Sequence, residues 1–143
     1  MSLGFELSQE LSPTFFTRDQ LPTLSATTGG AVATVLSRYL PGHNLEFRPP
    51  NDVYVEGKKI CGILLESPTP QYAILGIGVN VNNRISDIPP EFLRDFADRP
   101  ITSMIDLLDA KTDIFRLMDE LLTELHQHSG IALETGGNKQ EFL

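Results

Sequence analysis

The stretch from residue 48 to residue 66 constrains the fold of this chain more than any other part of the sequence. Two prolines open it, and the pair Glu56-Gly57 divides it into two segments that favour strands, a pattern typical of a β-hairpin with a two-residue turn. The first strand is expected at residues 53–55. The second is expected at residues 60–65, where a near-continuous apolar run predicts a strand that is covered on both faces.

Hydrophobic periodicity on both sides of this hairpin predicts an α+β or mixed α/β domain in which helices pack on a sheet. Prolines, glycines and capping residues mark the ends of the elements. The expected strands cover residues 5–11, 45–47 and 72–81, and the expected helices cover residues 23–40, 90–96 and 103–108 and the segment from the Asp113 cap to Ser129, while residues 136–139 are expected to fray.

Two adjacent glycines, Gly29 and Gly30, fall inside the first expected helix. Each costs roughly 1 kcal/mol relative to alanine in a helix interior. A helix that keeps them is therefore expected to pack closely against the sheet, or to allow a ligand to approach closely.

The 143-residue length and the 41% share of hydrophobic residues predict one domain, or part of one. A net charge of −8 and a pI near 4.7 argue against partners that need a basic surface, so neither nucleic acid nor a membrane is expected as a partner. The single cysteine, Cys61, excludes an internal disulfide, and its place in an apolar strand is typical of a buried small hydrophobe. Together with the lack of a signal-peptide pattern, this predicts a cytoplasmic protein.

Polar residues at neighbouring strand ends are candidates for a site. Asn51 and Asp52 follow the Pro-Pro corner, Lys59 lies where the chain turns back into the sheet, and Asn80 ends an apolar strand. Taken singly, Asn51 and Asp52 are compatible with turn formers, and Lys58 and Lys59 with a solvated hairpin end. Period-2 geometry directs the two lysines to opposite faces, so at most one is expected to face a site. Taken together, the four strand-end residues predict one shared pocket.

The strand end Gly76-Ile-Gly-Val-Asn80 places glycines beside these residues. It is not a dinucleotide-binding fingerprint, because no third glycine opens a helix. Glycine at such a position either lets a ligand approach the backbone or allows a helix to pack tightly, and the spacing leaves both possibilities open.

These motifs resemble those of the biotin protein ligases (biotin–[acetyl-CoA-carboxylase] ligases). The family pattern is Lys-Trp-Pro-Asn-Asp, then Lys-x-x-Gly-Ile-Leu-x-Glu, then Gly-x-Gly-x-Asn. The sequence has Arg-Pro-Pro-Asn-Asp at 48–52, Lys-Ile-Cys-Gly-Ile-Leu-Leu-Glu at 59–66 and Gly-Ile-Gly-Val-Asn at 76–80, and the preceding helix and a Thr-Ser segment within residues 99–104 also fit. The resemblance implies a class II synthetase-like, biotin ligase-type domain with a central mixed sheet. It makes residues 1–143 a single partial catalytic domain, with a core at about 5–130 and a tail at 131–143.

The resemblance further implies formation of biotinyl-5′-AMP from biotin and ATP with Mg²⁺, and transfer of biotin to a lysine of a biotin carboxyl carrier protein. Lys59 and Asp52 would be catalytic: Lys59 would stabilise charge between the biotin carboxylate and the α-phosphate, and Asp52 would orient or deprotonate the acceptor lysine. Asn80 would lie near the phosphates and Mg²⁺. The other residues implied to bind substrate are Arg48, Asn51, Gly62, Ile63, Gly76, Gly78 and Val79.

The sequence also departs from the family pattern. Arg48 replaces a lysine and Pro49 replaces a tryptophan, and no counterpart of the family's Gly/Arg-rich biotin loop, C-terminal β-barrel or N-terminal DNA-binding domain occurs in it. Three explanations follow: the chain is a fragment, a natural short paralogue without full activity, or one part of a site that another chain completes. A short domain of this kind would expose apolar surface and an unpaired strand edge, which predicts a homodimer or a partner chain.

Two functions of different classes therefore follow from the sequence. The first is an enzyme of the biotin protein ligase class. The alternative is a catalytically impaired paralogue that acts as a ligand-binding or interaction protein. Formation of biotinyl-5′-AMP distinguishes the two.

Overall fold

The computed structural model describes residues 2–10, 18–69, 72–129 and 141–142. Short 3-10 turns at Arg18–Gln20, Ile85–Asp87 and Arg94–Phe96 join the main elements. The helices are α1 (Leu21–Tyr39), α2 (Pro90–Leu93), α3 (Met104–Leu108) and α4 (Ile114–Ser129). The strands are β1 (Ser2–Glu10), β2 (Leu45–Arg48), β3 (Asp52–Val55), β4 (Lys58–Thr69), β5 (Tyr72–Asn80) and β6 (Glu141–Phe142).

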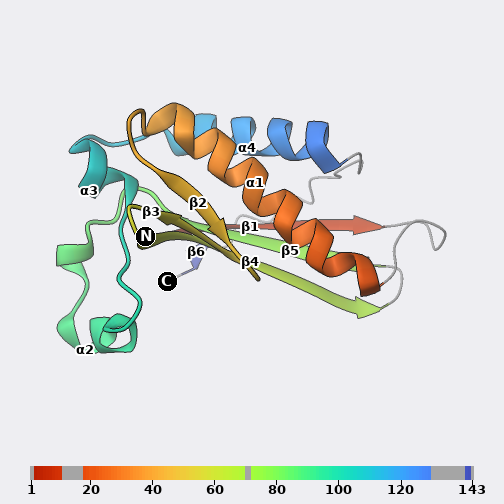
Figure 1. The fold of residues 1–143 in the computed structure, drawn as a ribbon, viewed down its shortest axis with the longest axis horizontal. Helices are drawn as coiled ribbons and strands as arrows, with labels where there is room; N and C mark the ends of the chain where they lie inside the picture. The colour runs from red at the N-terminus through yellow and green to blue at the C-terminus, as the bar shows by residue number, and fades with distance from the viewer. Residues whose placement is uncertain (1, 11–17, 70–71, 130–140, 143) are drawn as a thin grey trace.

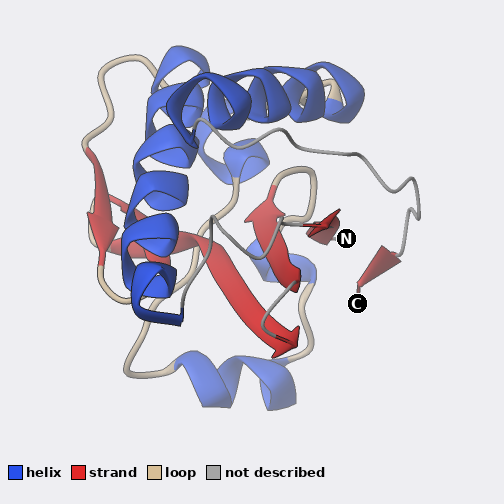
Figure 2. Ribbon diagram, turned by 90° about the vertical axis from the view of Figure 1, so that its right-hand side faces the viewer, coloured by secondary structure: helices blue, strands red, loops and turns tan. Residues whose placement is uncertain are grey.

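The fold has two layers, which confirms the expected α+β class. The strands form one sheet in the order β2-β3-β4-β5-β1-β6, and α1 and α4 lie side by side over one face of it (Figures 1 and 2). The named strands pair antiparallel throughout, although the resemblance implied a mixed sheet. The strand β6, which the sequence did not predict, extends the sheet beside β1.

The hairpin at the centre of the sequence is confirmed. Glu56 and Gly57 both have positive φ angles, 48° and 78°, between β3 and β4. Positive φ at both central residues is the signature of a type I′ turn, whose twist matches that of the flanking strands. The turn therefore fixes which residues of β3 and β4 face each other.

The core lies between the sheet and the two long helices. Alternate residues of β4 and β5 point into the core, and the apolar faces of α1 and α4 cover these side chains. Leu64, in contrast, is 59% exposed, so the expectation that β4 is covered on both faces was wrong. The buried residues of the core include Val32, Val35, Leu36, Val53, Ile63, Leu75, Ile77, Val79, Leu117, Leu121 and Leu125.

Helix α1 packs closely on β2, which accounts for Gly29. A Cβ atom added to Gly29 would lie 2.0 Å from a ring carbon of Phe47, whereas one added to Gly30 would meet nothing within 4 Å among the described residues beyond the backbone of its own helix and its chain neighbours. Of the two possibilities left by the sequence, the structure shows close packing against the sheet. The same helix also holds the corner before β3, because the Ser25 hydroxyl donates a hydrogen bond of 2.6 Å to the carbonyl of Pro50.

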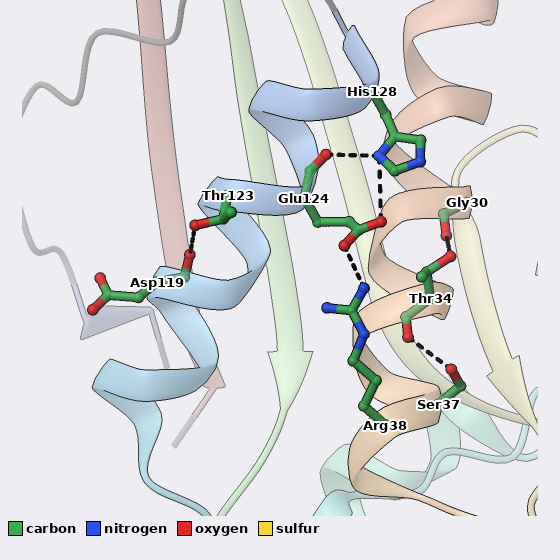
Figure 3. A network of polar contacts seen from close by, with 8 residues as sticks. All are labelled: Gly30, Thr34, Ser37, Arg38, Asp119, Thr123, Glu124 and His128. Atoms are coloured by element: carbon green, nitrogen blue, oxygen red, sulfur yellow. Dashed lines mark hydrogen bonds and ion pairs between the residues drawn. The ribbon is translucent and has the colours of Figure 1, made fainter.

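Helix α4 is fixed to α1 by a charged network that Figure 3 shows. The Glu124 carboxylate, whose side chain is only 7% exposed, lies 2.6 Å from the Arg38 guanidinium and 3.3 Å from Nδ1 of His128. At the other end of α4, the Asp113 carboxylate accepts hydrogen bonds from the backbone N–H groups of Phe115 and Arg116, which confirms the predicted cap.

Several sequence expectations fall at the margins of the described residues. Residue 11 of the first expected strand and the tail at 136–139 lie outside them.

Within the described ranges, no helix is both long enough and apolar enough to cross a membrane.

Candidate functional site: the open face of the sheet

The candidate site lies on the face of the sheet opposite α1 and α4. The loop that carries α2 lies beyond one end of this face (Figure 1), and Leu64 is exposed in the middle of β4. We call this side of the sheet the open face.

A row of glycines crosses the open face. The antiparallel register places Asp52 of β3 opposite Gly62 of β4, Gly62 opposite Gly78 of β5, and Gly78 opposite Gly4 of β1. Among the described residues, and apart from its chain neighbours, the nearest atom to a Cβ on Gly78 would be the carbonyl oxygen of Gly62, at 3.9 Å. Since α1 and α4 cover the other face, helix packing does not account for Gly62 and Gly78. Three adjacent glycines leave a flat stretch of backbone that a ligand can approach closely.

A β-bulge turns Lys59 toward this row. The register between β3 and β4 shifts between Val53 and Tyr54, so that Tyr54 faces Lys59 and Ile60 is the extra residue. Lys59 and Gly62 are three residues apart, and strict alternation would place them on opposite faces. The bulge instead brings Lys59 to the face of Asp52 and Gly62, a common effect of bulges near sites.

The Lys59 ammonium lies 2.7 Å from Oδ1 of Asp52, and both side chains are largely buried, at 31% and 17% exposure. The ammonium would also lie 3.4 Å from a Cβ placed on Gly62, so it stands directly over the glycine row. Lys58 is exposed, so of the two lysines it is Lys59 that lies beside the glycine row. The structure therefore concentrates one cation and one anion beside a bare stretch of sheet.

Asn51 and Arg48 lie at the rim of this site. The side chain of Asn51 is exposed. The main-chain carbonyl of Asn51 accepts a 2.7 Å hydrogen bond from the N–H of Ile63. The Arg48 guanidinium lies 4.1 Å from the centre of the Tyr54 ring and forms an ion pair with Glu46. Arg48 is thus held beside the Lys59–Asp52 pair and not within it.

Asn80 reaches Lys59 through a segment that follows it in the chain. Its Nδ2 donates a 3.1 Å hydrogen bond to the carbonyl of Thr102. The N–H of Thr102 in turn donates to the carbonyl of Lys59 at 2.9 Å, and the N–H of Lys59 donates to the carbonyl of Pro100 at 2.8 Å. The sequence did not predict this backbone contact, and the only signal near it was the Thr-Ser segment of the family resemblance.

Two residues expected to bind substrate lie elsewhere. The side chains of Ile63 and Val79 are 2% and 1% exposed and belong to the core under the helices. The expectation that these two residues bind substrate is therefore corrected as far as their side chains are concerned. Strand alternation turns both side chains away from the open face. Gly76 lies on the open face beside Leu64. A Cβ atom placed on Gly76 would lie 3.5 Å from the Cβ of Leu64.

Asn80 is also the residue that the resemblance placed near Mg²⁺. No group of three or more histidine, cysteine, aspartate or glutamate side chains gathers within the described ranges. A magnesium ion that arrives with ATP commonly takes only one or two protein oxygens, with phosphate and water as its other ligands. The Oδ1 of Asn80, which is oriented by the hydrogen bond of Nδ2 to Thr102, is suited to be one of these protein oxygen ligands.

Cys61 lies directly beneath the site but points into the core. It is 1% exposed, and burial raises the pKa of its thiol to about 12, against an ordinary value of 9.0; the charge of Lys59 lowers the pKa and that of Asp52 raises it. The thiol is thus unreactive in the folded protein.

Cys61 is expected to react with a thiol reagent at pH 8 at least about 10-fold more slowly in the native protein than in denaturant, because each unit of raised pKa removes nine-tenths of the thiolate. The free energy of unfolding should also fall as the pH rises between about 9 and 12, because over this range the Cys61 thiol loses its proton in the unfolded state but keeps it in the folded state. Labelling kinetics and denaturant titrations measure both effects. The Cys61→Ala variant should lose this component of the pH dependence, and equal labelling rates in both states would contradict the prediction.

Comparisons with known proteins agree on one family. The model of the Biotin/lipoate A/B protein ligase family matches residues 6–80. The chain is 37% identical over 76 residues to the biotin–[acetyl-CoA-carboxylase] ligase of Mycobacterium tuberculosis (strain ATCC 25618 / H37Rv), covering 53% of this chain and 25% of that protein. It is 40% identical over 60 residues to the bifunctional ligase/repressor BirA of Bacillus subtilis (strain 168), covering 39% of this chain and 18% of that protein.

Solved structures give the same result. The apo biotin protein ligase from Aquifex aeolicus superimposes with a TM-score of 0.71 at 27% identity, covering 89% of this chain and 52% of that one. The ligase from the same organism in complex with biotin and ATP gives a TM-score of 0.69 at 27% identity, covering 87% and 49% of the two chains. The chain thus spans about half the length of these solved chains, and the matched region is a quarter or less of the curated relatives.

Proposed function

The chain belongs to the biotin/lipoate A/B protein ligase family, and on this premise we propose that its open face binds biotin and ATP, forms biotinyl-5′-AMP, and passes biotin to a lysine of a biotin carboxyl carrier protein. The support from relatives is that one is a biotin–[acetyl-CoA-carboxylase] ligase and that a solved neighbour holds biotin and ATP. The observation that carries the proposal is the Lys59 ammonium, paired with Asp52 over the glycine row.

In the first step, an oxygen of the biotin carboxylate attacks the α-phosphorus of ATP. A new carboxyl–phosphorus anhydride bond forms, the bond from the α-phosphorus to the bridging oxygen breaks, and pyrophosphate leaves. Two anionic groups must approach each other, so the barrier depends on positive charge placed where they meet. Lys59 supplies that charge, and its partial burial strengthens the interaction relative to bulk water.

The glycine row explains how the reacting groups can come near Lys59. A side chain at Gly62 would occupy the space directly beside the ammonium, and one at Gly78 would occupy the neighbouring space on the same face. With hydrogen in their place, the ligand can lie flat on the sheet and present its carboxylate to Lys59. Gly76 and the exposed Leu64 continue this surface and offer contact to apolar parts of the ligand.

In the second step, the acceptor lysine attacks the activated carbonyl carbon. An amide bond forms, the bond from that carbon to the phosphate oxygen breaks, and AMP leaves. The acceptor must first lose a proton, since an ammonium group has no free electron pair. Asp52 lies within 2.7 Å of the Lys59 ammonium, so it stands where a carboxylate could orient the acceptor and take up that proton.

The Mg²⁺ that accompanies ATP would neutralise part of the phosphate charge, and Asn80 would hold it through Oδ1. Asn51 and Arg48, at the rim beside Asp52, would border the nucleotide and the biotin-binding surface. These assignments follow the positions of the residues in the family motifs and their places around the Lys59–Asp52 pair.

We also propose that the protein acts with a second copy of itself or with a partner chain. The open face leaves the large apolar side chain of Leu64 exposed at 59% in the middle of β4. Light scattering is expected to give a mass above that of one chain, and a monodisperse monomer would contradict this part of the proposal.

The function is tested by incubating the purified protein with α-labelled ATP, biotin and Mg²⁺ and separating the labelled products. Biotinyl-5′-AMP is expected, and its formation should depend on biotin. A folded protein that forms no adenylate would contradict the proposed activity. If it still bound biotin or ATP in calorimetry, it would fit the alternative of a binding paralogue.

A further inference from the structure

The backbone of Lys59 is held by residues that are distant in sequence. Its N–H donates to the carbonyl of Pro100 and its carbonyl accepts from the N–H of Thr102, so both of its main-chain polar groups are used by one segment. Lys59 and Ile101 thereby form a parallel bridge, outside the antiparallel ladder of the named strands. The direction in which the Lys59 side chain leaves the sheet therefore depends on where this segment lies. We call residues 100–102 the clasp.

The clasp is in turn fastened to the end of β5. The carbonyl of Thr102 accepts from Nδ2 of Asn80, and the N–H of Ile105 donates to the carbonyl of Val81 at 2.9 Å. Thr102 is only 5% exposed and the following Ser103 is fully buried. A buried carbonyl that loses its donor is costly, so the bond from Asn80 is a strong constraint on the position of the clasp.

Thr102 therefore connects the two strand ends within a single residue. Its N–H binds Lys59 and its carbonyl binds Asn80. A displacement of the clasp at Asn80 is transmitted to Lys59 through one residue, Thr102, whose two flanking peptide groups make the two bonds. Since sub-ångström placement of a catalytic group matters for rate, this connection has consequences for the chemistry at the Lys59 ammonium.

We propose that the clasp positions Lys59 for catalysis and that Asn80 acts as a positioning residue through its amide nitrogen, in addition to any contact of its Oδ1 with Mg²⁺ or phosphate. The proposal rests on the proposed function, because positioning is judged by the rate of adenylate formation. The proposal gives the two ends of the Asn80 amide different roles: Nδ2 holds the clasp, and Oδ1 faces Mg²⁺ or phosphate. Variants that change one end and not the other can test this.

The Asn80→Asp variant keeps an oxygen ligand and removes the donor to Thr102. It is expected to lower kcat for adenylate formation about 10-fold, with little change in KM for biotin or in the Mg²⁺ concentration that gives half the maximal rate. Asn80→Ala removes the donor without adding charge and should lose at least as much kcat. Because it also removes the Oδ1 proposed to hold Mg²⁺, this variant alone should in addition raise the Mg²⁺ concentration that gives half the maximal rate. In both variants, hydrogen exchange should accelerate at the backbone amides of Lys59 and Thr102, which NMR measures without any substrate.

Asn82 provides a matched control. Its Nδ2 donates to the carbonyl of Thr112 and its Oδ1 accepts from the N–H of Thr112, both at 2.9 Å, so its amide also fastens a later segment of the chain, but not the segment 100–102 that binds the backbone of Lys59. Asn82→Asp should change the melting temperature as much as Asn80→Asp does, yet leave kcat and the exchange of the Lys59 and Thr102 amides unchanged.

The proposal is overturned if Asn80→Asp retains the wild-type kcat, if Asn82→Asp reduces kcat equally, or if the Asn80 variants shift only the Mg²⁺ requirement. An unmodified protein that makes no adenylate would instead contradict the proposed function. In that case the hydrogen exchange of the Asn80 variants still decides whether the clasp holds Lys59, and unchanged exchange would exclude it.

Discussion

Replacement of Lys59 by alanine is expected to lower the rate of biotinyl-5′-AMP formation by about 100-fold or more, the usual effect of removing one preorganised charge or donor from a developing anion. The structure gives the physical reason. The ammonium stands 2.7 Å from Asp52 above a row of glycines, and β3 and β4 place no other described lysine on the open face. Its loss leaves two anionic reactants and the Asp52 carboxylate in the same space.

Lys58 is the matched control for this experiment, because it is the same residue type one position earlier and its side chain is exposed. Lys58→Ala should retain activity within about two-fold, as expected for a surface substitution away from special features. Lys59→Arg keeps the charge but replaces a compact ammonium with a planar fork, so partial activity is expected. Rates would be measured with labelled ATP, and thermal unfolding would confirm that each variant is folded. Equal activities of the Lys58 and Lys59 alanine variants would remove the central role proposed for Lys59.

Replacement of Gly29 by alanine is expected to destabilise the protein by about 2 kcal/mol. A methyl group at this position would lie 2.0 Å from the ring of Phe47, and forcing additional atoms into a packed contact costs about 1–3 kcal/mol. The new alanine returns roughly 1 kcal/mol through its better helix propensity. Because a separation of 2.0 Å is far shorter than a normal contact, the cost of packing lies at the upper end of its range, and a net loss of about 2 kcal/mol remains. Chemical denaturation monitored by circular dichroism would measure the change.

The adjacent glycine tests whether the effect is packing and not helix propensity. Gly30→Ala introduces the same methyl group where no described residue outside its own helix turn lies within 4 Å, and it should stabilise the protein by up to about 1 kcal/mol. In a Phe47→Ala background, Gly29→Ala should no longer destabilise, because the two changes share one contact and are not additive. A destabilising Gly29→Ala that persists in that background would show that another contact is responsible.

The sequence predicted features that depend on neighbouring residues. The two-residue hairpin turn follows from Glu56-Gly57, since glycine readily takes a positive φ, and the cap of α4 follows from Asp113 before an amphipathic stretch. The prediction that only one of Lys58 and Lys59 faces a site also depended on local alternation. The pairing of Lys59 with Asp52 is consistent with the predicted convergence of these polar residues.

Features that depend on the sheet as a whole were not predictable in this way. The bulge at Ile60 changes the face that Lys59 occupies, and no residue pattern announces an extra residue in one strand. The exposure of Leu64 depends on which side α1 and α4 cover, which an apolar run does not reveal. The contact of the clasp with Lys59 is formed by backbone groups, which every residue but proline offers alike, so its sequence signal is weak.

The strand order also has a consequence for how the chain folds. Strands β2, β3, β4 and β5 are neighbours both in the sequence and in the sheet, whereas β1 pairs residues 2–10 with residues 72–80. Contacts between distant segments must first overcome the entropy of closing a long loop, so sequential hairpins tend to form sooner. We therefore expect the β3–β5 meander, with the Lys59–Asp52 pair, to be protected in pulsed hydrogen exchange before β1 docks. The charged pair of the site would then exist at an early stage of folding, and β1 would complete its glycine floor last.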